Sequence, residues 1–159
     1  MSPAKLPQGC TNFKVRQLMR HIGRIYDAEM ANCGLKTTQY SLLSNVLNLG
    51  PIRPADLAEA MHMTPSTLSR NLQPLLAAGW IEMGAGVDAR SRLLRITDAG
   101  RVKRREAQGH WKVAQLALNE RLGADKVSAL HALIDDSLAL LGSEPEGESD
   151  QEVEGAIND

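Results

Sequence analysis

Apolar residues recur at steps of three and four along most of the chain, and this period predicts α-helices. The helices are expected at about 11–32, 37–49, 54–61, 64–78, 99–121 and 125–141. Between the fourth and the fifth, residues 80–83 and 92–96 have strand-like composition, and the glycine-containing stretch that joins them predicts a turn. The pattern therefore indicates a mainly α-helical fold with one small β-hairpin.

Threonine and glycine mark several of the expected helix ends. Gly34 ends the first helix, and Thr37 or Thr38 is expected to cap the second. Thr97 with its neighbouring aspartate caps the fifth helix, which Gly109 is expected to interrupt because glycine is a poor helix former.

The fourth helix combines a leucine-rich face with an unusual polar one. Thr64 caps it, Pro65 occupies its first turn, and Pro74 lies inside it, where the missing backbone donor is expected to bend the helix. The apolar face consists of Leu68, Leu72, Leu75 and Leu76. The opposite side chains are mostly short hydroxyl and amide groups, with one arginine. Short polar side chains of this kind are mediocre helix formers, so stability alone does not explain them.

Two short helices joined by a tight turn, with the second opening on small polar residues, describe a helix-turn-helix. Its second helix enters the DNA major groove, where hydroxyls, amides and arginines contact base edges and phosphates. The expected DNA-binding face consists of Thr64, Pro65, Ser66, Thr67, Ser69, Arg70, Asn71 and Gln73. The competing interpretation is an ordinary solvated helix face, and the preceding helix and the following hairpin argue against it.

The hairpin supplies arginines next to this helix. Arg90 and Arg92 follow its turn, and one of them is expected to contact the DNA backbone or the minor groove. Asp88 can hold one of these arginines in a bidentate ion pair. Arg53, in the turn before the third helix, is a weaker phosphate candidate. The basic run at 101–106 is expected to be a solvated helix face.

The formal net charge of −1 conceals a strong asymmetry. Residues before 143 contain all 18 lysines and arginines but 12 of the 19 acidic residues, a net charge of +6, which suits a DNA-binding domain. Residues 143–159 contain seven acidic residues and no basic one, and they lack the apolar content to fold. We therefore expect an acidic, disordered tail after the domain and a flexible arm at 1–9.

The sequence shows no signal-peptide pattern and no apolar run of membrane-spanning length, and the spacing of the two cysteines predicts no disulfide framework. A cytoplasmic protein without membrane contact is the natural expectation. The chain shows no grouping of catalytic residues, and His62, His110 and His131 lack partners at metal-ligand spacing. We therefore expect neither an enzyme nor a bound metal or cofactor.

Three stretches form a specific set in combination, namely LAEAMHMTPSTLSRNLQPLLAAGWIE, DARSR and LLRITDAGR. With them the chain resembles the MarR family of bacterial winged-helix transcription regulators over about residues 10–141. The resemblance implies a winged helix-turn-helix domain at 10–142, with a DNA-binding lobe at 37–98 and dimerisation helices at 10–36 and 99–142. It also implies a homodimer on a pseudo-palindromic DNA site, and repression or occasional activation that a small ligand or cysteine oxidation relieves.

The same resemblance implies a ligand site between the first, second and fifth helices. The polar and aromatic residues on those elements are Arg16, Arg20, His21, Tyr40 and Trp111. An arginine or histidine beside an aromatic wall suits an aromatic carboxylate. Each of these residues is also explained singly as a surface charge, a core ring or a dimer contact.

Two alternatives to a ligand-released repressor remain. A peroxide-sensing branch of the family has a reactive cysteine near the start of the first helix, where Cys10 lies, so a thiol switch is one alternative. For Cys10 itself we favour an ordinary cysteine, because the residues beside it include no tyrosine that would activate the thiol; Cys33 is expected to be packed. The other alternative is a winged-helix module that binds proteins without specific DNA binding.

Overall fold

The computed structural model describes residues 8–86, 88 and 91–142. The predictions made for Arg90, for most of the N-terminal arm and for the acidic tail therefore lie outside the described residues. The chain divides into two compact units, Met1–Arg121 and Leu122–Asp159, which are considered separately below.

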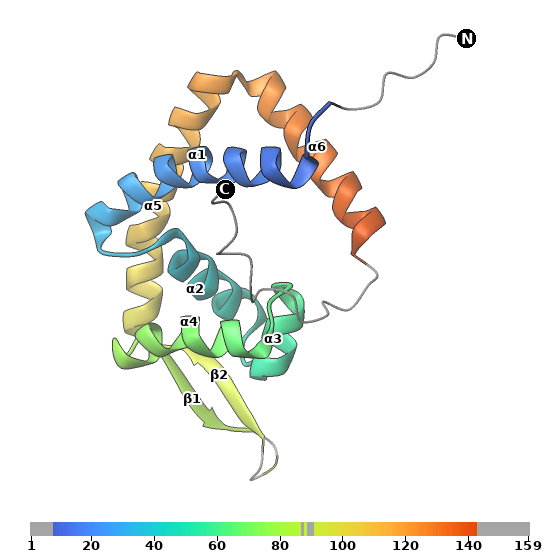
Figure 1. Ribbon diagram of the computed structural model, residues 1–159. Helices are drawn as coiled ribbons and strands as arrows, with labels where there is room; N and C mark the ends of the chain where they lie inside the picture. The colour runs from blue at the N-terminus through green and yellow to red at the C-terminus, as the bar shows by residue number, and fades with distance from the viewer. Residues whose placement is uncertain (1–7, 87, 89–90, 143–159) are drawn as a thin grey trace, which may run out of the picture. The chain divides into compact units, whose positions relative to one another are not determined.

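The first unit contains five α-helices and one hairpin among its described residues (Figure 1). Helix α1 is followed by a single 3-10 turn, η1, which replaces the last residues of the predicted first helix. The helical elements are α1 (Thr11–Met30), η1 (Ala31–Cys33), α2 (Thr37–Leu49), α3 (Pro54–Ala60), α4 (Pro65–Ala77) and α5 (Asp98–Leu122). The predicted order of elements is confirmed.

The hairpin consists of β1 (Ile81–Ala85) and β2 (Arg92–Ile96), which pair antiparallel with Ile81 opposite Ile96. Ile52, just before α3, forms an isolated antiparallel β-bridge with Leu94 of β2. Its N–H and C=O exchange hydrogen bonds of 3.1 and 2.8 Å with Leu94. This bridge fixes the base of the hairpin to the segment that leads into the helix-turn-helix.

The core of the unit lies where α2, α3, α4 and the hairpin meet. Its most deeply buried side chains are Met30, Leu42, Leu43, Val46, Leu57, Leu68, Leu75, Ile81 and Leu94. The leucine face predicted for α4 is therefore confirmed, except that Leu76 is only partly buried. Burying this face holds α4 on the lobe and leaves its opposite side exposed.

The prediction that Thr37 or Thr38 caps α2 is wrong. The N-cap residue is Lys36, not Thr37 or Thr38, and the Lys36 N–H donates a 2.8 Å hydrogen bond to Gln39 Oε1. The Thr37 hydroxyl instead donates to Asp27 Oδ1 at 2.7 Å, which ties the start of α2 to α1. Thr37 therefore makes a contact with another helix and does not cap its own.

The prediction that Gly109 interrupts the fifth helix is also wrong, because α5 continues without a break through Gly109. One glycine costs an exposed helix only about 1 kcal/mol relative to alanine. The strong helix formers on either side offset that cost. The predicted cap at the N-terminus of α5 is confirmed, because Thr97 Oγ1 accepts the Gly100 N–H at 3.0 Å.

The second unit contributes α6 (Ala124–Leu141) to the described residues. Of its predicted apolar stripe, Val127 is buried, whereas Ile134, Leu138 and Leu141 are exposed. None of the helices that the structure describes is both long and apolar enough to cross a membrane.

Candidate nucleic-acid interface

The first turn of α4 is organised by Thr64. Its Oγ1 accepts the Thr67 N–H at 3.3 Å, and its hydroxyl donates to Thr67 Oγ1 at 2.9 Å. Ser66 Oγ lies 3.2 Å from the same hydroxyl, and Pro65 occupies the first helical position. The helix therefore begins with three hydroxyl groups that contact one another at the protein surface.

The two sides of α4 differ sharply in exposure. Leu68, Leu72 and Leu75 are at most 3% exposed. The predicted DNA-binding face is exposed at Thr64, Pro65, Ser66, Thr67, Ser69, Arg70 and Gln73, and half-buried at Asn71. Hydroxyl, amide and guanidinium groups are thus presented to solvent on a helix that leucines anchor from behind.

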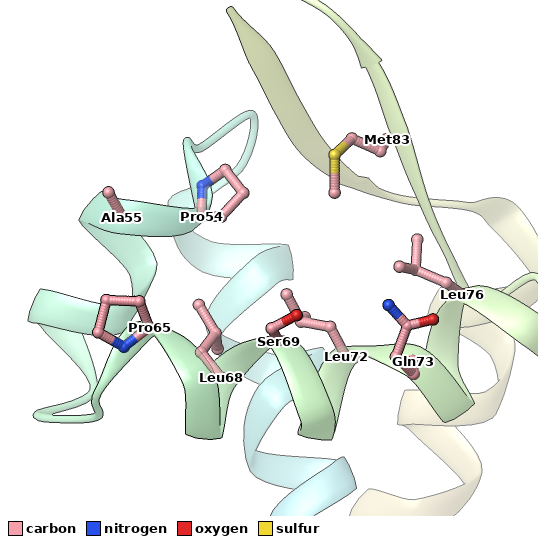
Figure 2. Close-up of a pocket in the computed structure, with 9 residues that line it drawn as sticks. All are labelled: Pro54, Ala55, Pro65, Leu68, Ser69, Leu72, Gln73, Leu76 and Met83. Carbon is pink, nitrogen blue, oxygen red and sulfur yellow. The ribbon is translucent and has the colours of Figure 1, made fainter.

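A shallow apolar recess borders this face (Figure 2). It measures about 190 Å³ and lies between the start of α3, the helix α4 and Met83 of β1. Ser69 and Gln73 are the polar side chains at its wall, and both also belong to the predicted DNA-binding face. The recess therefore lies between the exposed face of α4 and the hairpin.

The hairpin turn is closed by Ser91. Its backbone C=O accepts the Gly86 N–H at 2.7 Å, and its N–H donates to the Asp88 C=O at 3.0 Å. Arg92 is exposed at the start of β2, opposite Ala85. No ion pair joins Asp88 to Arg92 in the part of the chain that the structure describes, and Arg90 lies outside it, so the predicted bidentate pair stays a prediction.

Arg53 is exposed but already has a carboxylate partner. Its Nε lies 2.7 Å from Asp56 Oδ2 and its Nη2 lies 3.1 Å from Asp56 Oδ1, a bidentate ion pair across the first turn of α3. These hydrogen bonds raise the pKa of the Arg53 guanidinium. A phosphate would have to compete with Asp56 for this side chain, which weakens Arg53 as a DNA contact.

Two residues of the predicted ligand set come together between α2 and α5. The rings of Tyr40, which is buried, and Trp111 lie 6.3 Å apart. Arg104 is the cation beside them: its guanidinium lies 5.8 Å from the Tyr40 ring centre, and its Nε donates to Ser44 Oγ at 3.2 Å. Arg104 belongs to the basic run at 101–106 that was predicted to be solvated, although its position seven residues before Trp111 puts both side chains on one face of α5.

The remaining members of that set do not join this cluster. Arg16, Arg20 and His21 are exposed on α1, and the Arg16 guanidinium donates to Asn12 Oδ1 at 3.2 Å. The basic run on α5 is also less solvated than expected, because Lys103 lies 5.5 Å above the Trp80 ring and pairs with Glu106 at 3.1 Å.

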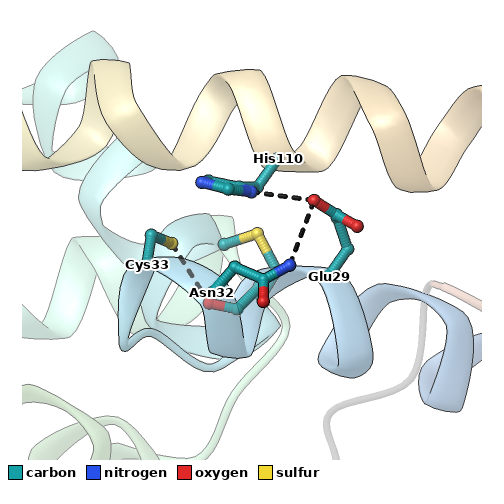
Figure 3. Close-up of polar contacts among 5 residues, drawn as sticks. Glu29, Asn32, Cys33 and His110 are labelled. Atoms are coloured by element: carbon teal, nitrogen blue, oxygen red, sulfur yellow. Dashed lines mark hydrogen bonds and ion pairs between the residues drawn. The ribbon is translucent and has the colours of Figure 1, made fainter.

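Polar contacts also join α1 to α5 (Figure 3). His110 Nδ1 lies 2.8 Å from Glu29 Oε1, which also accepts a 3.4 Å hydrogen bond from Asn32 Nδ2. The hydrogen bond from His110 is the main reason that the pKa of Glu29 is lowered. Further along, the Tyr26 hydroxyl donates to Gln115, and burial raises the pKa of Tyr26.

The two cysteines differ in environment. Cys33 is 4% exposed, and its thiol donates to the Met30 C=O at 3.1 Å, as expected of a packed residue. Cys10 is exposed at the N-cap of α1. No cluster of three or more histidine, cysteine or carboxylate side chains suited to a metal occurs among the residues with described positions.

Comparisons with known proteins support the interpretation of residues 37–98 as a DNA-binding lobe. Residues 34–91 match the family model described as the MarR family. An uncharacterised HTH-type transcriptional regulator of Bacillus subtilis, YwoH, is 25% identical over 112 residues, which cover 70% of this chain and 79% of the relative.

Solved structures show the same fold over most of the chain. The M. tuberculosis transcriptional regulator MosR in complex with DNA is similar with a TM-score of 0.68 and 25% identity, over 83% of this chain and 98% of that one. A MarR mutant from E. coli complexed with operator DNA gives a TM-score of 0.72 at 20% identity, over 80% and 92% of the two chains. A probable transcriptional regulator from Pseudomonas aeruginosa gives 0.73 at 22% identity, over 80% and 96%.

Proposed function

We propose that this MarR-family winged-helix protein is a homodimeric transcriptional repressor that binds a pseudo-palindromic promoter site and is released by a small ligand. The observation that carries the DNA-binding part is the exposed polar face of α4 on a buried leucine base, beside a hairpin with Arg92 exposed. Hydroxyl, amide and guanidinium groups in this arrangement match the contacts that a recognition helix makes in the major groove. Two of the similar structures were solved with DNA, which supports the same conclusion.

The experiment is selection of duplex DNA from a random pool with the full-length protein, followed by affinity measurement on the enriched site. We expect an inverted repeat, bound with an affinity that falls steeply as salt rises because phosphate contacts release counterions. Arg70→Ala should relax the sequence preference at one position of each half-site and cost about 1–3 kcal/mol, as for a base-contacting arginine.

Arg121→Ala serves as the matched control, because Arg121 is an exposed arginine at the far end of α5. Its loss should leave the sequence preference unchanged. A well-folded protein that enriches no sequence would contradict the repressor and favour the protein-interaction module instead.

Dimerisation is supported by apolar side chains that each unit leaves exposed. On one side of α1 these are Val15, Leu18 and Met19, and on α6 they are Leu133, Ile134, Leu138, Leu140 and Leu141. Exposed apolar surface of this extent ordinarily marks an interface. A second copy of the chain, related by a two-fold axis, would present a second α4 to the other half of a palindrome.

The release mechanism rests on the Tyr40–Trp111–Arg104 cluster. A guanidinium beside two aromatic rings can hold an aromatic carboxylate by an ion pair and stacking. Titration of the protein–DNA complex with benzoate and its derivatives tests this: release by millimolar ligand, lost in Arg104→Ala, is the expected result. Release that persists in Arg104→Ala places the ligand elsewhere.

A thiol switch at Cys10 is the second candidate, and the exposure of Cys10 at the start of α1 supports it. Peroxide should then abolish DNA binding of the wild type but not of Cys10→Ser. A peroxide response that persists in Cys10→Ser excludes this cysteine.

A further inference from the structure

The two faces of the hairpin have different neighbours. Strand residues alternate between faces, so Met83 and Leu94, which are opposite each other, share one face, and Gly84 and Arg95 share the other. Leu94 is fully buried and Met83 borders the recess beside α4, so their face is directed toward the helices. Gly84 and Arg95 therefore lie on the face of the hairpin that is directed away from the recess.

On that outer face, the Arg95 side chain lies across Gly84. A Cβ atom built on Gly84 would be only 2.6 Å from Arg95 Nη1. In the register of the sheet Arg95 is opposite Glu82, and Gly84 is opposite Leu93. Arg95 thus crosses the ribbon diagonally and reaches past its own partner toward the turn, and it can do so because position 84 has no side chain.

The charge of Arg95 is not matched by an ion pair among the residues that the structure describes. Glu82 is the residue directly opposite, a position in which opposite charges commonly pair, yet no ion pair or side-chain hydrogen bond joins Arg95 to any residue in the described ranges. Arg95 is nevertheless half-buried against the strand. A held guanidinium has up to five N–H donors and a planar shape that suits a phosphate.

We propose that Arg95 is a DNA-phosphate contact of the hairpin and that Gly84 is the positioning residue that directs it there. The proposal rests on the proposed DNA binding. Arg92 and Arg95 are three residues apart on β2, about 10 Å along an extended strand, and they project from opposite faces of the hairpin, so they contact different phosphate groups. The hairpin then holds DNA along its length as well as at its turn.

The variant Gly84→Ala separates this role from a structural one. The atom that the new methyl group meets is the end of a flexible side chain, so Arg95 moves aside while the strands keep their pairing. Alanine is also better tolerated than glycine in a strand. We expect Gly84→Ala to melt at the same or a higher temperature than the wild type but to bind the selected DNA site about three- to tenfold more weakly.

The variant Arg95→Ala should weaken binding by a similar factor and reduce the slope of log affinity against log salt by about 0.9, the value for one lost phosphate contact. Lys112→Ala removes the same charge from an exposed position of α5 and controls for net charge. In the double variant, Gly84→Ala should cause no further loss, because it acts only through Arg95.

The result that overturns the proposal is an Arg95→Ala affinity and salt slope equal to those of Lys112→Ala. An effect of Gly84→Ala that persists undiminished in the Arg95→Ala background also overturns it, since Gly84 would then act by another route. Both results leave the proposed function intact if the wild type still selects an inverted repeat. A wild type that selects no DNA overturns the proposed function and this inference together.

Discussion

At the scale of single residues, His62 in the turn between α3 and α4 carries a backbone conformation that suits glycine. Its φ is +51°, the left-handed region, which costs a residue with a Cβ about 1 kcal/mol or more. His62→Gly should therefore raise the free energy of unfolding by about 0.5–1 kcal/mol, after the added flexibility of the unfolded chain is subtracted. Urea unfolding followed by circular dichroism measures it.

Ala60→Gly, two residues earlier in α3, is the matched control, because Ala60 is exposed and helical. There the same change should lower stability by about 0.5–1 kcal/mol. Loss of stability in both variants would mean that the His62 side chain contributes more than its backbone strain costs.

Two glycines of α5 allow one substitution to be compared in two environments. A Cβ on Gly100 would collide with the backbone oxygen of Trp80, whereas a Cβ on Gly109 meets nothing within 4 Å. Gly109→Ala should raise the free energy of unfolding by about 1 kcal/mol through helix propensity. Gly100→Ala should lower it by about 1–3 kcal/mol through overpacking. Thermal and urea unfolding of the two variants provide the comparison, and equal effects would contradict it.

Among the helices and strands, the features that could be predicted from the sequence are those that local periodicity controls. The helices, the hairpin and the buried leucines of α4 follow from spacing alone, because each element needs an apolar face. The exposure of Ser69, Arg70 and Gln73 followed from the same spacing. The resemblance to a known family added the predictions of a dimer and of a ligand site, which no periodicity reveals, and both stay predictions.

The features that the sequence did not reveal depend on partners distant along the chain. The Thr37 hydroxyl bonds Asp27 of α1, so capping of α2 passes to Lys36 and Gln39. Arg104 was grouped with solvated charges, although α2 supplies a tyrosine ring beneath it. Such contacts arise only when helices pack.

The contact between α1 and α5 makes stability depend on pH. The folded protein lowers the pKa of Glu29, chiefly through the hydrogen bond from His110, so the ionised carboxylate stabilises the folded state. A lowered carboxyl pKa adds stability that is fully present above the ordinary value of 4.5 and is lost as pH falls through the lowered pKa.

Glu29→Gln should therefore be less stable than the wild type at pH 7, and the difference should disappear in acid below the lowered pKa of Glu29. Urea unfolding between pH 3 and pH 7 tests this (the range spans the titration of a carboxyl group). Glu120→Gln, an exposed carboxyl on α5, is the control. A difference for Glu29→Gln that is constant across the range would show that the charge of Glu29 has no role.

At the scale of the whole molecule, the proposed function requires an assembly that one chain does not provide. In the proposed function a single α4 reads one half-site, and affinity for a palindrome comes from two copies held at a fixed separation. On α1, Val15 and Met19 are 58% and 65% exposed and lie one turn apart, while Gln17 lies on the opposite side of the helix. The apolar side of α1 is therefore the surface on which a substitution tests the dimer.

Met19→Asp places a charge on that side, where burial against a second copy would cost several kcal/mol unless the charge is paired. We expect this variant to sediment as a monomer at micromolar concentration and to lose most of its affinity for the palindrome, while a single half-site binds both proteins equally weakly. Gln17→Asp adds the same charge to the opposite side of the helix and should remain dimeric with wild-type affinity. If Met19→Asp also stays dimeric, α1 does not form the interface, and the exposed apolar residues of α6 become the surface on which the dimer depends.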